Sequence, residues 1–238
     1  IITSSDPSSG YYKYSPDVVG SKYTVLFDGE KYITAGKNGH IAYSNDGVYW
    51  LENSDSKINI TIKSITFDNS KKVFCAVGEG GKIYYTDDPS GEWFNSGNAG
   101  SEDFNDIIYT ASKFIAVGNK GSLYISGDCI SWLKVDTKVS TDLNSVIVNG
   151  NDIVVVGDSG TILKSSNPSG PYTKVNFPNS YNILDLAYGN GFYLLVTQEV
   201  SGFVINSRIY KSTDLTNFSL ANSYLSQAIY SIAFGSNY

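Results

Sequence analysis

Two carboxylates, Asp106 and Asp185, offer the clearest opportunity for chemistry in this chain of 238 residues. Two acidic side chains at a suitable separation can serve as general acid and general base in glycoside hydrolysis. Each begins a short apolar run, and the equivalent positions of other apolar runs carry the hydroxyl residues Thr24, Ser64, Ser145 and Ser231. We expect these positions to ring the mouth of a central channel. A polar plug that satisfies backbone groups is the favoured interpretation, ahead of a catalytic pair or an oxygen-ligated cation.

The other reactive residue types are scarce. His40 is the single histidine, which excludes a histidine-based triad or a multi-histidine metal site, and we expect it to face solvent in a turn. Cys75 lies in an apolar strand pattern and Cys129 in a turn, so we expect two free thiols rather than a disulfide or a thiolate metal site. No cofactor and no metal are expected.

Charge and composition restrict the partners. Lys+Arg 17 against Asp+Glu 23 gives a net charge of −6, which argues against nucleic acid because phosphate binding needs a basic surface. No apolar run approaches the roughly 18 residues of a membrane-spanning helix, so membrane insertion is not expected. The Ser-, Thr-, Asn- and Tyr-rich composition indicates an extracellular or cell-surface location. The lack of an initiator methionine indicates a piece of a larger multidomain protein.

A glycine-x-x-glycine motif recurs along the chain between β-branched and aromatic residues. Its first glycines are Gly36, Gly78, Gly118 and Gly157, so the repeat length is 42, 40 and 39 residues. Two apolar runs joined by a glycine-bounded link predict a β-hairpin, because glycine permits the positive φ that the link needs. A further short apolar strand precedes each hairpin. Each repeat therefore has the size of one four-stranded propeller blade.

A turn with an aromatic anchor follows each hairpin, at residues 44–50, 86–93, 126–132, 165–172 and 212–218. An Asp or Asn side chain can accept backbone N–H groups across such a turn, and the aromatic ring buries area between sheets. The residues that we assign to these roles are Asp46, Asp88, Asp128, Asn167 and Asp214, with Trp50, Trp93 and Trp132. Cys129 and Leu215 stand where glycine is expected, so we expect these two turns to differ in backbone shape.

These turns resemble the Asp-box, or BNR, repeat of sialidase-like β-propellers, and the resemblance covers almost the whole chain. It implies an all-β protein with one propeller domain over residues 1–238. We expect a six-bladed propeller of four-stranded blades, with five blades at about 24–62, 63–104, 105–143, 144–183 and 184–228. The sixth blade is split between the termini, residues 1–15 and 229–238, which removes two exposed sheet edges. A ring of five blades is the alternative.

Sialidase activity, which the resemblance suggests, is rejected. The family's catalytic site is associated with three arginines that clamp the substrate carboxylate and with a tyrosine nucleophile. This chain has one arginine, Arg208, and lysine is a poor substitute for a guanidinium in such a clamp.

The fifth repeat departs from the others. Residues 196–209 replace the short link with a longer one that carries Phe203 and Arg208. Insertions in repeat proteins often lie on the binding face, although a merely longer hairpin explains the sequence equally well.

We therefore expect a non-catalytic extracellular module that binds a carbohydrate or a cell-surface glycan. A protein–protein interaction scaffold is the alternative, and a glycosidase with a carboxylate pair is less favoured. Aromatic rings beside polar groups suit sugar recognition. The expected ligand-binding residues are Tyr181, Tyr224, Tyr230, Asp106, Asp185, Phe203 and Arg208.

Overall fold

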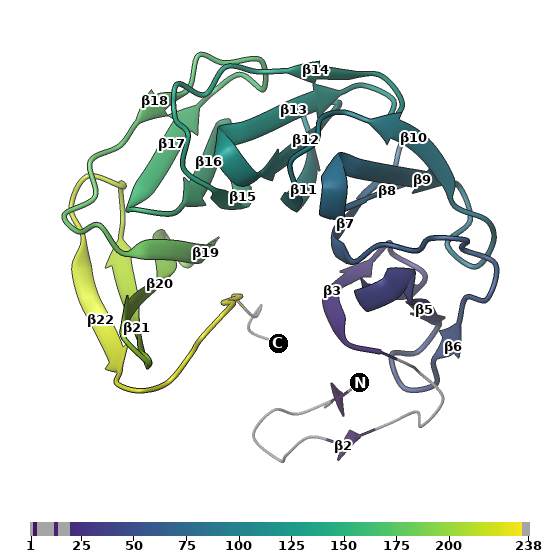
Figure 1. Cartoon of the computed structure of the whole chain (residues 1–238), viewed down its shortest axis with the longest axis horizontal. Coiled ribbons are helices and arrows are strands. Elements are labelled where there is room, and N and C mark those ends of the chain that lie inside the picture. The colour runs from purple at the N-terminus through teal and green to yellow at the C-terminus, as the bar shows by residue number, and fades with distance from the viewer. Residues whose placement is uncertain (1, 4–11, 14–19, 235–238) are drawn as a thin grey trace. The chain divides into compact units, whose positions relative to one another are not determined.

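The computed structural model describes residues 2–3, 12–13 and 20–234, which consist of strands, turns and short 3₁₀ segments. Strands β3 to β22 form five four-stranded sheets, each made of consecutive strands (Figure 1). We number these sheets as blades one to five. The all-β prediction is confirmed, and so is the four-stranded blade.

The strand bounds follow the chain from blade to blade. Blade one contains β3 (Lys22–Phe27), β4 (Tyr32–Gly36), β5 (Ile41–Ser44) and β6 (Leu51–Glu52). Blade two contains β7 (Ile62–Asp68), β8 (Val73–Gly78), β9 (Lys82–Thr86) and β10 (Phe94–Asn98). Blade three contains β11 (Phe104–Thr110), β12 (Lys113–Gly118), β13 (Ser122–Ser126) and β14 (Trp132–Lys134). Blade four contains β15 (Leu143–Asn149), β16 (Asp152–Gly157), β17 (Thr161–Ser165) and β18 (Thr173–Lys174). Blade five contains β19 (Asn182–Gly189), β20 (Phe192–Ser201), β21 (Val204–Ser212) and β22 (Ser219–Tyr224).

The chain divides into two compact units. Unit one runs to residue 114 and includes residues 126–132, while unit two contains residues 115–125 and continues from residue 133. The boundary therefore runs through the sheet of blade three. Each unit has its own core and is described by itself.

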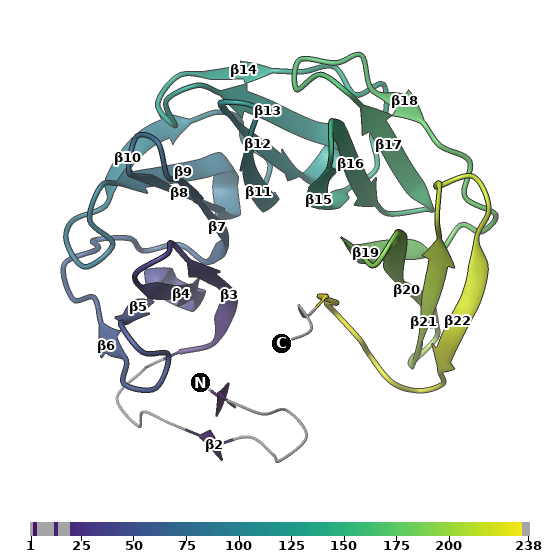
Figure 2. The same cartoon turned by 180° about the vertical axis from the view of Figure 1, so that it is seen from behind.

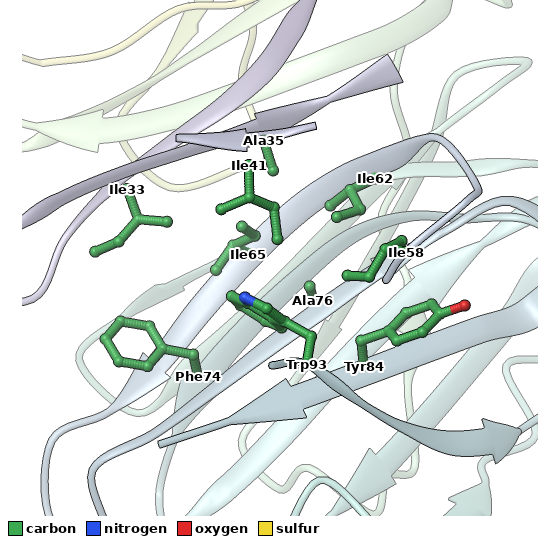
Figure 3. Packing of buried hydrophobic residues seen from close by; sticks show 10 residues of the cluster. All are labelled: Ile33, Ala35, Ile41, Ile58, Ile62, Ile65, Phe74, Ala76, Tyr84 and Trp93. Carbon is green, nitrogen blue, oxygen red and sulfur yellow. The ribbon is translucent and has the colours of Figure 1, made fainter. Parts of the chain in front are cut away.

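The core of unit one lies between the sheets of blades one and two (Figure 3). Ile33, Ala35 and Ile41 of blade one are fully buried against side chains of blade two, which include Ile62, Phe74 and Trp93. Each fully buried isoleucine stabilises the fold by about 2 kcal/mol relative to exposure. Trp93, which the sequence assigns as an anchor between sheets, is 3% exposed and lies in this cluster.

The core of unit two is built in the same way between blades four and five. Val154, Val156 and Ile162 of blade four pack with residues of blade five such as Ile183 and Leu195. The second strands of blades one to four are buried on both faces, as in Ile153–Val156 of β16. This explains why these strands have continuous apolar runs rather than alternation.

The links between second and third strands need their glycines for two different reasons. Gly121, the second glycine of its link, has φ +71, and a Cβ there would lie 2.1 Å from the carbonyl oxygen of Val139. Gly157, a first glycine, has no positive φ, yet a Cβ would lie 2.0 Å from the carbonyl oxygen of Asp142. Positive φ thus contributes to the need for the second glycine. Close approach of an interblade loop contributes at both glycines: the loop before the blade approaches the first, and the loop after the blade approaches the second.

A repeated hydrogen bond fastens the links of blades two, three and four to the start of the next blade. The backbone N–H of Gly80 donates to Oδ1 of Asp103 at 2.8 Å. The N–H of Lys120 donates to Oδ1 of Asp142 at 2.9 Å, and that of Ser159 to Oδ1 of Asn182 at 3.1 Å. The residues at the start of these next blades are therefore held by the backbone of the links.

The prediction of a sixth blade split between the termini is wrong. The four-stranded sheets of the described residues number five, β1 (Ile2–Thr3) and β2 (Tyr12–Lys13) pair only with each other, and residues 229–234 form no strand. A first strand needs a second strand as its pairing partner, and no described residue after β22 supplies one. The remaining residues of the predicted sixth blade, at 1, 4–11, 14–15 and 235–238, lie outside the described residues.

The prediction of two free thiols is also wrong, because Cys75 and Cys129 form a disulfide. Cys75 lies in β8 of blade two and Cys129 in the turn after β13 of blade three, and both are fully buried. The two residues are 54 positions apart. Their pairing depends on the packing of two neighbouring sheets, which the local patterns do not report.

Candidate functional site: blade five and its C-terminal segment

The predicted ligand-binding residues gather on blade five, with one exception. Tyr181 precedes β19, Asp185 lies in β19, and Arg208 and Tyr224 lie in β21 and β22. Phe203 lies between β20 and β21, and Tyr230 lies in residues 225–234, which we call the C-terminal segment. Asp106 is the exception, because it lies in β11 of unit one.

Arg208 is already engaged by two neighbours. Its Nη2 lies 3.0 Å from Oε2 of Glu199, in an ion pair that joins β20 and β21. Its guanidinium also stacks over the ring of Tyr181 at 4.5 Å from the ring centre. Stacking and ion pairing both favour a planar guanidinium over an ammonium. These two contacts give Arg208 a structural role. The guanidinium also covers a face of the Tyr181 ring, so that this face is not open to a sugar.

Two more tyrosines of this region have polar partners. The OH of Tyr224 accepts a hydrogen bond from Nδ2 of Asn222 at 3.0 Å. The OH of Tyr210, behind Arg208, accepts one from Nδ2 of Asn179 at 3.2 Å. Burial raises the pKa of Tyr210 above its usual value. Tyr230, in contrast, is 69% exposed.

The two candidate carboxylates bind strands together. Oδ1 of Asp106 accepts hydrogen bonds from Oγ of Ser64 and from its neighbour's N–H, both at 2.8 Å. Asp185 accepts four. Its Oδ1 accepts hydrogen bonds from Oγ of Ser145 and from the N–H of Leu186, each at 2.9 Å. Its Oδ2 accepts hydrogen bonds from Oγ of Ser231 at 2.6 Å and from the N–H of Ile232 at 2.9 Å.

A β-bulge positions the polar residue of the first strand in four of the blades. The register of the first strand shifts just before Thr24, Ser64, Ser145 and Asp185 in their respective blades. A bulge turns a side chain away from the regular alternation. The recurrence of the shift explains why a small polar residue or an aspartate is placed at the same point of each of these strands.

The aspartates of the turns after the third strands have a structural role, because they accept hydrogen bonds from backbone N–H groups of their own turns. Oδ1 of Asp46 accepts the N–H groups of Val48 and Tyr49 at 2.8 and 2.9 Å, and Oδ1 of Asp128 and Asp214 accept the equivalent pairs. The donated N–H of Tyr49, followed by that of Val48, keeps the pKa of Asp46 below its usual value. Oδ1 of Asp88 and of Asn167 accepts the N–H two residues further on.

The expectation that Cys129 and Leu215 give different turns is wrong. Their φ values of +60 and +62 are close to the +73 of Gly47 at the same position. Left-handed backbone costs an ordinary residue about 1 kcal/mol or more. The disulfide of Cys129 and the burial of Leu215, which is 1% exposed, hold that conformation.

The long hairpin of blade five carries an apolar tip, which we define as Val200, Phe203 and Val204. Strands β20 and β21 pair without a break from Tyr193↔Ser212 to Ser201↔Val204, so the sheet extends beyond the level of the short links elsewhere. Phe203 is fully exposed, and Val200 is 64% exposed. Leu225, which directly follows β22, is 69% exposed. Alternation within residues 199–205 could have indicated Val200 and Val204, which the sequence reasoning missed.

The C-terminal segment is fastened to blade five. The N–H of Ser226 donates to Oδ1 of Asn206 at 3.0 Å, and Oγ of Ser207 donates to the carbonyl oxygen of Gln227 at 2.9 Å. Figures 1 and 2 show this segment leaving β22 and returning toward β19. It therefore contributes exposed side chains to the surface of blade five.

Other candidate sites carry less. His40 is half-buried rather than solvent-facing, and its Nδ1 lies 2.9 Å from Oε1 of Glu52. One surface pocket of about 330 Å³ is lined in part by Phe67, Phe74 and Asp87, and none of the predicted ligand-binding residues lines it.

Among the described residues, no three His, Cys, Asp or Glu side chains are grouped to hold a metal ion. None of the helices in the described part of the chain has the length and apolarity needed to cross a membrane.

Comparisons with known proteins identify the fold but not a family. No family model and no curated protein matches the chain. A solved structure of YCF48 bound to D1 peptide is 13% identical, with a TM-score of 0.64 over 82% of this chain and 67% of that one. The WD40 β-propeller domain of Doa1 is 12% identical, with a TM-score of 0.62 over 85% and 68%. The GH74 enzyme of Niastella koreensis is 18% identical, with a TM-score of 0.65 over 88% of this chain but 32% of its own. These similarities establish a β-propeller fold.

Proposed function

We propose that this β-propeller is a non-catalytic binding module that docks a partner polypeptide through the apolar tip of blade five. The observation that carries the proposal is the fully exposed Phe203, which stands between two exposed valines on the hairpin that is extended in blade five. Exposed aromatic residues flanked by aliphatic ones are typical centres of protein interfaces. Without a partner, an exposed apolar patch of this kind favours aggregation.

Charge favours a protein partner over other extended partners. The chain has a net charge of −6, which disfavours nucleic acid and anionic lipid surfaces. The residues of the tip, 200–205, contain no charged side chain. Apolar contact with a pocket or groove of a partner protein then provides the affinity, since charge complementarity is absent at the tip.

The solved structures support a binding role in this fold. YCF48, of similar fold, is bound to a D1 peptide, and WD40 propellers share the architecture. The GH74 enzyme shows that a propeller can also belong to an enzyme. In this chain Asp106 and Asp185 serve as acceptors between strands, so we propose no catalytic role for them.

Two finer proposals accompany this one. We propose that the turns around Asp46, Asp128 and Asp214 are Asp-box turns, which their shared pattern of accepted N–H groups supports. We also propose that the protein works outside the reducing cytosol, since the buried disulfide of Cys75 and Cys129 is of the structural kind that persists in oxidising compartments.

Glycan recognition is the second candidate, and the exposed ring of Tyr230 favours it. An unpaired aromatic face suits the apolar side of a sugar ring. Tyr181 no longer supports it, because Arg208 covers that ring.

A peptide-display selection tests the proposal. A random twelve-residue library is selected on the wild type, and the enriched peptides are then measured on Phe203→Ser and on Tyr49→Ser. Tyr49 is the matched control, because it is a largely exposed aromatic residue, 76% exposed, of a turn in blade one. We expect at least tenfold weaker binding to Phe203→Ser and unchanged binding to Tyr49→Ser. Equal binding to all three proteins contradicts the docking site. A glycan-array signal that Tyr230→Ala removes, without peptide enrichment, establishes the second candidate instead.

A further inference from the structure

Successive first strands are joined by a hydrogen bond that recurs along the chain. Oγ of Ser64 in β7 donates to Asp106 in β11, 42 residues later, at 2.8 Å. Oγ of Ser145 in β15 donates to Asp185 in β19, 40 residues later, at 2.9 Å. This contact marks neighbouring first strands within each unit.

The C-terminal segment makes the same contact from the other side of Asp185. Oγ of Ser231, 46 residues beyond Asp185, donates to its Oδ2 at 2.6 Å, and the N–H of Ile232 donates to the same atom at 2.9 Å. Residues 229–234 therefore occupy the place of a first strand next to β19, although they form no strand.

Packing along β19 supports this placement. The ring of Phe234 fills the space beside Gly189, where a Cβ would lie 2.4 Å from its Cγ. The same ring meets Phe192 edge-on, with ring centres 5.2 Å apart. At the other end, Nε2 of Gln198 donates to the carbonyl oxygen of Ile229 at 2.9 Å. The segment is thus anchored at both ends along blade five.

One edge of the segment has no pairing partner among the described residues. The N–H of Ile232 is used by Asp185, and successive N–H groups of an extended chain point to opposite edges. Those of Ser231 and Ala233 then point to the opposite edge, away from Asp185. No described strand pairs there, and Tyr230, Ser231 and Ala233 are exposed.

We propose that the edge of residues 229–234 binds an extended strand of a partner polypeptide, which pairs antiparallel to it by β-strand addition. The repeats define the chemistry of this partner. The first strands β3, β7, β15 and β19 all pair with an apolar second strand, such as β8 with Phe74–Val77 or β16 with Ile153–Val156. The partner strand is accordingly apolar, rich in β-branched residues and free of proline. The proposal does not rest on the apolar tip.

A synthetic peptide with the sequence of residues 113–126, the second and third strands of blade three with their link, is the probe. Its binding to the full chain is followed by calorimetry and by amide hydrogen exchange. We expect the amides of Ser231 and Ala233 to exchange within seconds in the free protein and at least tenfold more slowly with the peptide bound. The same peptide with proline in place of the residue that corresponds to Ile115 should not bind.

Two variants of one position separate pairing from packing. Ala233→Pro removes a donor from the free edge and should weaken peptide binding at least tenfold. Ala233→Val keeps the donor and should bind within about threefold of the wild type. Phe203→Ser should bind the peptide like the wild type, so that failure of the proposed function leaves this result unchanged.

Three results would overturn the proposal. The first is slow exchange of Ser231 and Ala233 in the free protein, which means that the edge is already paired. The second is the absence of peptide binding to a folded wild type. The third is equal binding by Ala233→Pro and Ala233→Val.

Discussion

Cys75 and Cys129 join the second strand of blade two to the turn that follows the third strand of blade three, with their Cα atoms 6.1 Å apart. Both side chains are fully buried. The bond also fixes the left-handed backbone of Cys129, where Gly47 stands in blade one. One covalent link therefore stabilises both a contact between neighbouring sheets and a turn that its own sequence disfavours.

Removal of this disulfide should lower the stability of the fold. Closing a loop of 54 residues corresponds to about 4 kcal/mol in the chain-entropy model. Cys75→Ala combined with Cys129→Ala should lower the free energy of unfolding in urea by about 3 to 4 kcal/mol. The wild type with a reductant should show a similar loss, and the double variant should not respond to reductant. An unchanged urea midpoint in both proteins would contradict the structural role.

The second glycine of a link should tolerate alanine worse than a glycine of an open turn. Gly121 and Gly150 have similar positive φ values of +71 and +60, but only Gly121 has a backbone oxygen in the path of a Cβ, at 2.1 Å. Gly150→Ala should cost about 1 kcal/mol from φ alone, and Gly121→Ala about 3 kcal/mol because the loop must also move. Urea unfolding measures both, and equal losses would show that close approach is unimportant.

Stability should fall in acid because turn aspartates bind backbone N–H groups. The hydrogen bonds from the side chain and N–H of Thr216, and from the N–H of Asn217, lower the pKa of Asp214. At Asp128, burial alone raises the pKa, but the N–H groups of Ser131 and Ile130, the hydroxyl of Ser126 and the charge of Lys71 together outweigh it, and the pKa is lowered. A carboxyl with a lowered folded pKa stabilises the fold above its unfolded pKa of about 3.9, and this contribution is lost as pH falls through the folded value.

The free energy of unfolding should therefore be nearly constant from about pH 7 to about pH 5 and decrease below about pH 4. Asp128→Asn should unfold with a weaker dependence on pH in the acid range. Asp87→Asn is the matched control, since no hydrogen bond to the Asp87 carboxylate is found among the described residues. Urea unfolding at pH 3, 4, 5 and 7 decides the matter, and an acid slope of Asp128→Asn equal to that of the control would refute the assignment.

Asp185 should contribute more to the free energy of unfolding than any exposed aspartate. It accepts hydrogen bonds from Ser145, Leu186, Ser231 and Ile232. Asp185→Ala leaves these donors without their acceptor, at a cost of about 3 kcal/mol. Asp185→Asn retains one acceptor oxygen and should lose less. Thermal unfolding with amide exchange of Ile232, whose N–H donates to Asp185, provides the measurement, and unchanged exchange of this amide in Asp185→Ala would contradict the anchoring role.

Local patterns predicted most of the fold. The glycines at the start and end of the links placed the turns between second and third strands in blades one to four. A Cβ at either glycine of the link in blade one, two or four would clash with the backbone. Trp50 and Trp93 are buried as anchors. The prediction of a sixth blade was wrong, because the similarity of residues 229–234 to a first strand does not show that a second strand is present to pair with them. Strand pairing is a long-range property, and sequence similarity between segments cannot supply a missing strand.

The candidate site was less predictable from the sequence. Tyr181 and Arg208 were both named as ligand-binding residues. Their mutual stacking was not predicted, because it joins a loop residue to a strand residue 27 positions later in the sequence. Composition also favoured free thiols, although the disulfide depends on how blades two and three pack. Phe203 was named because its link is unusually long, and it remains a prediction as a binding residue. Its full exposure is a property that only the folded hairpin shows.

The hydrogen bonds from Gly80, Lys120 and Ser159 to Asp103, Asp142 and Asn182 have a consequence for how such a chain can change in evolution. Donor and acceptor are separated by 23, 22 and 23 residues, and the donor is always a main-chain amide. An unequal crossover between two copies at matching points therefore regenerates the bond in the recombinant. The array can gain or lose whole copies by recombination, and no compensating substitution is needed at the new junction.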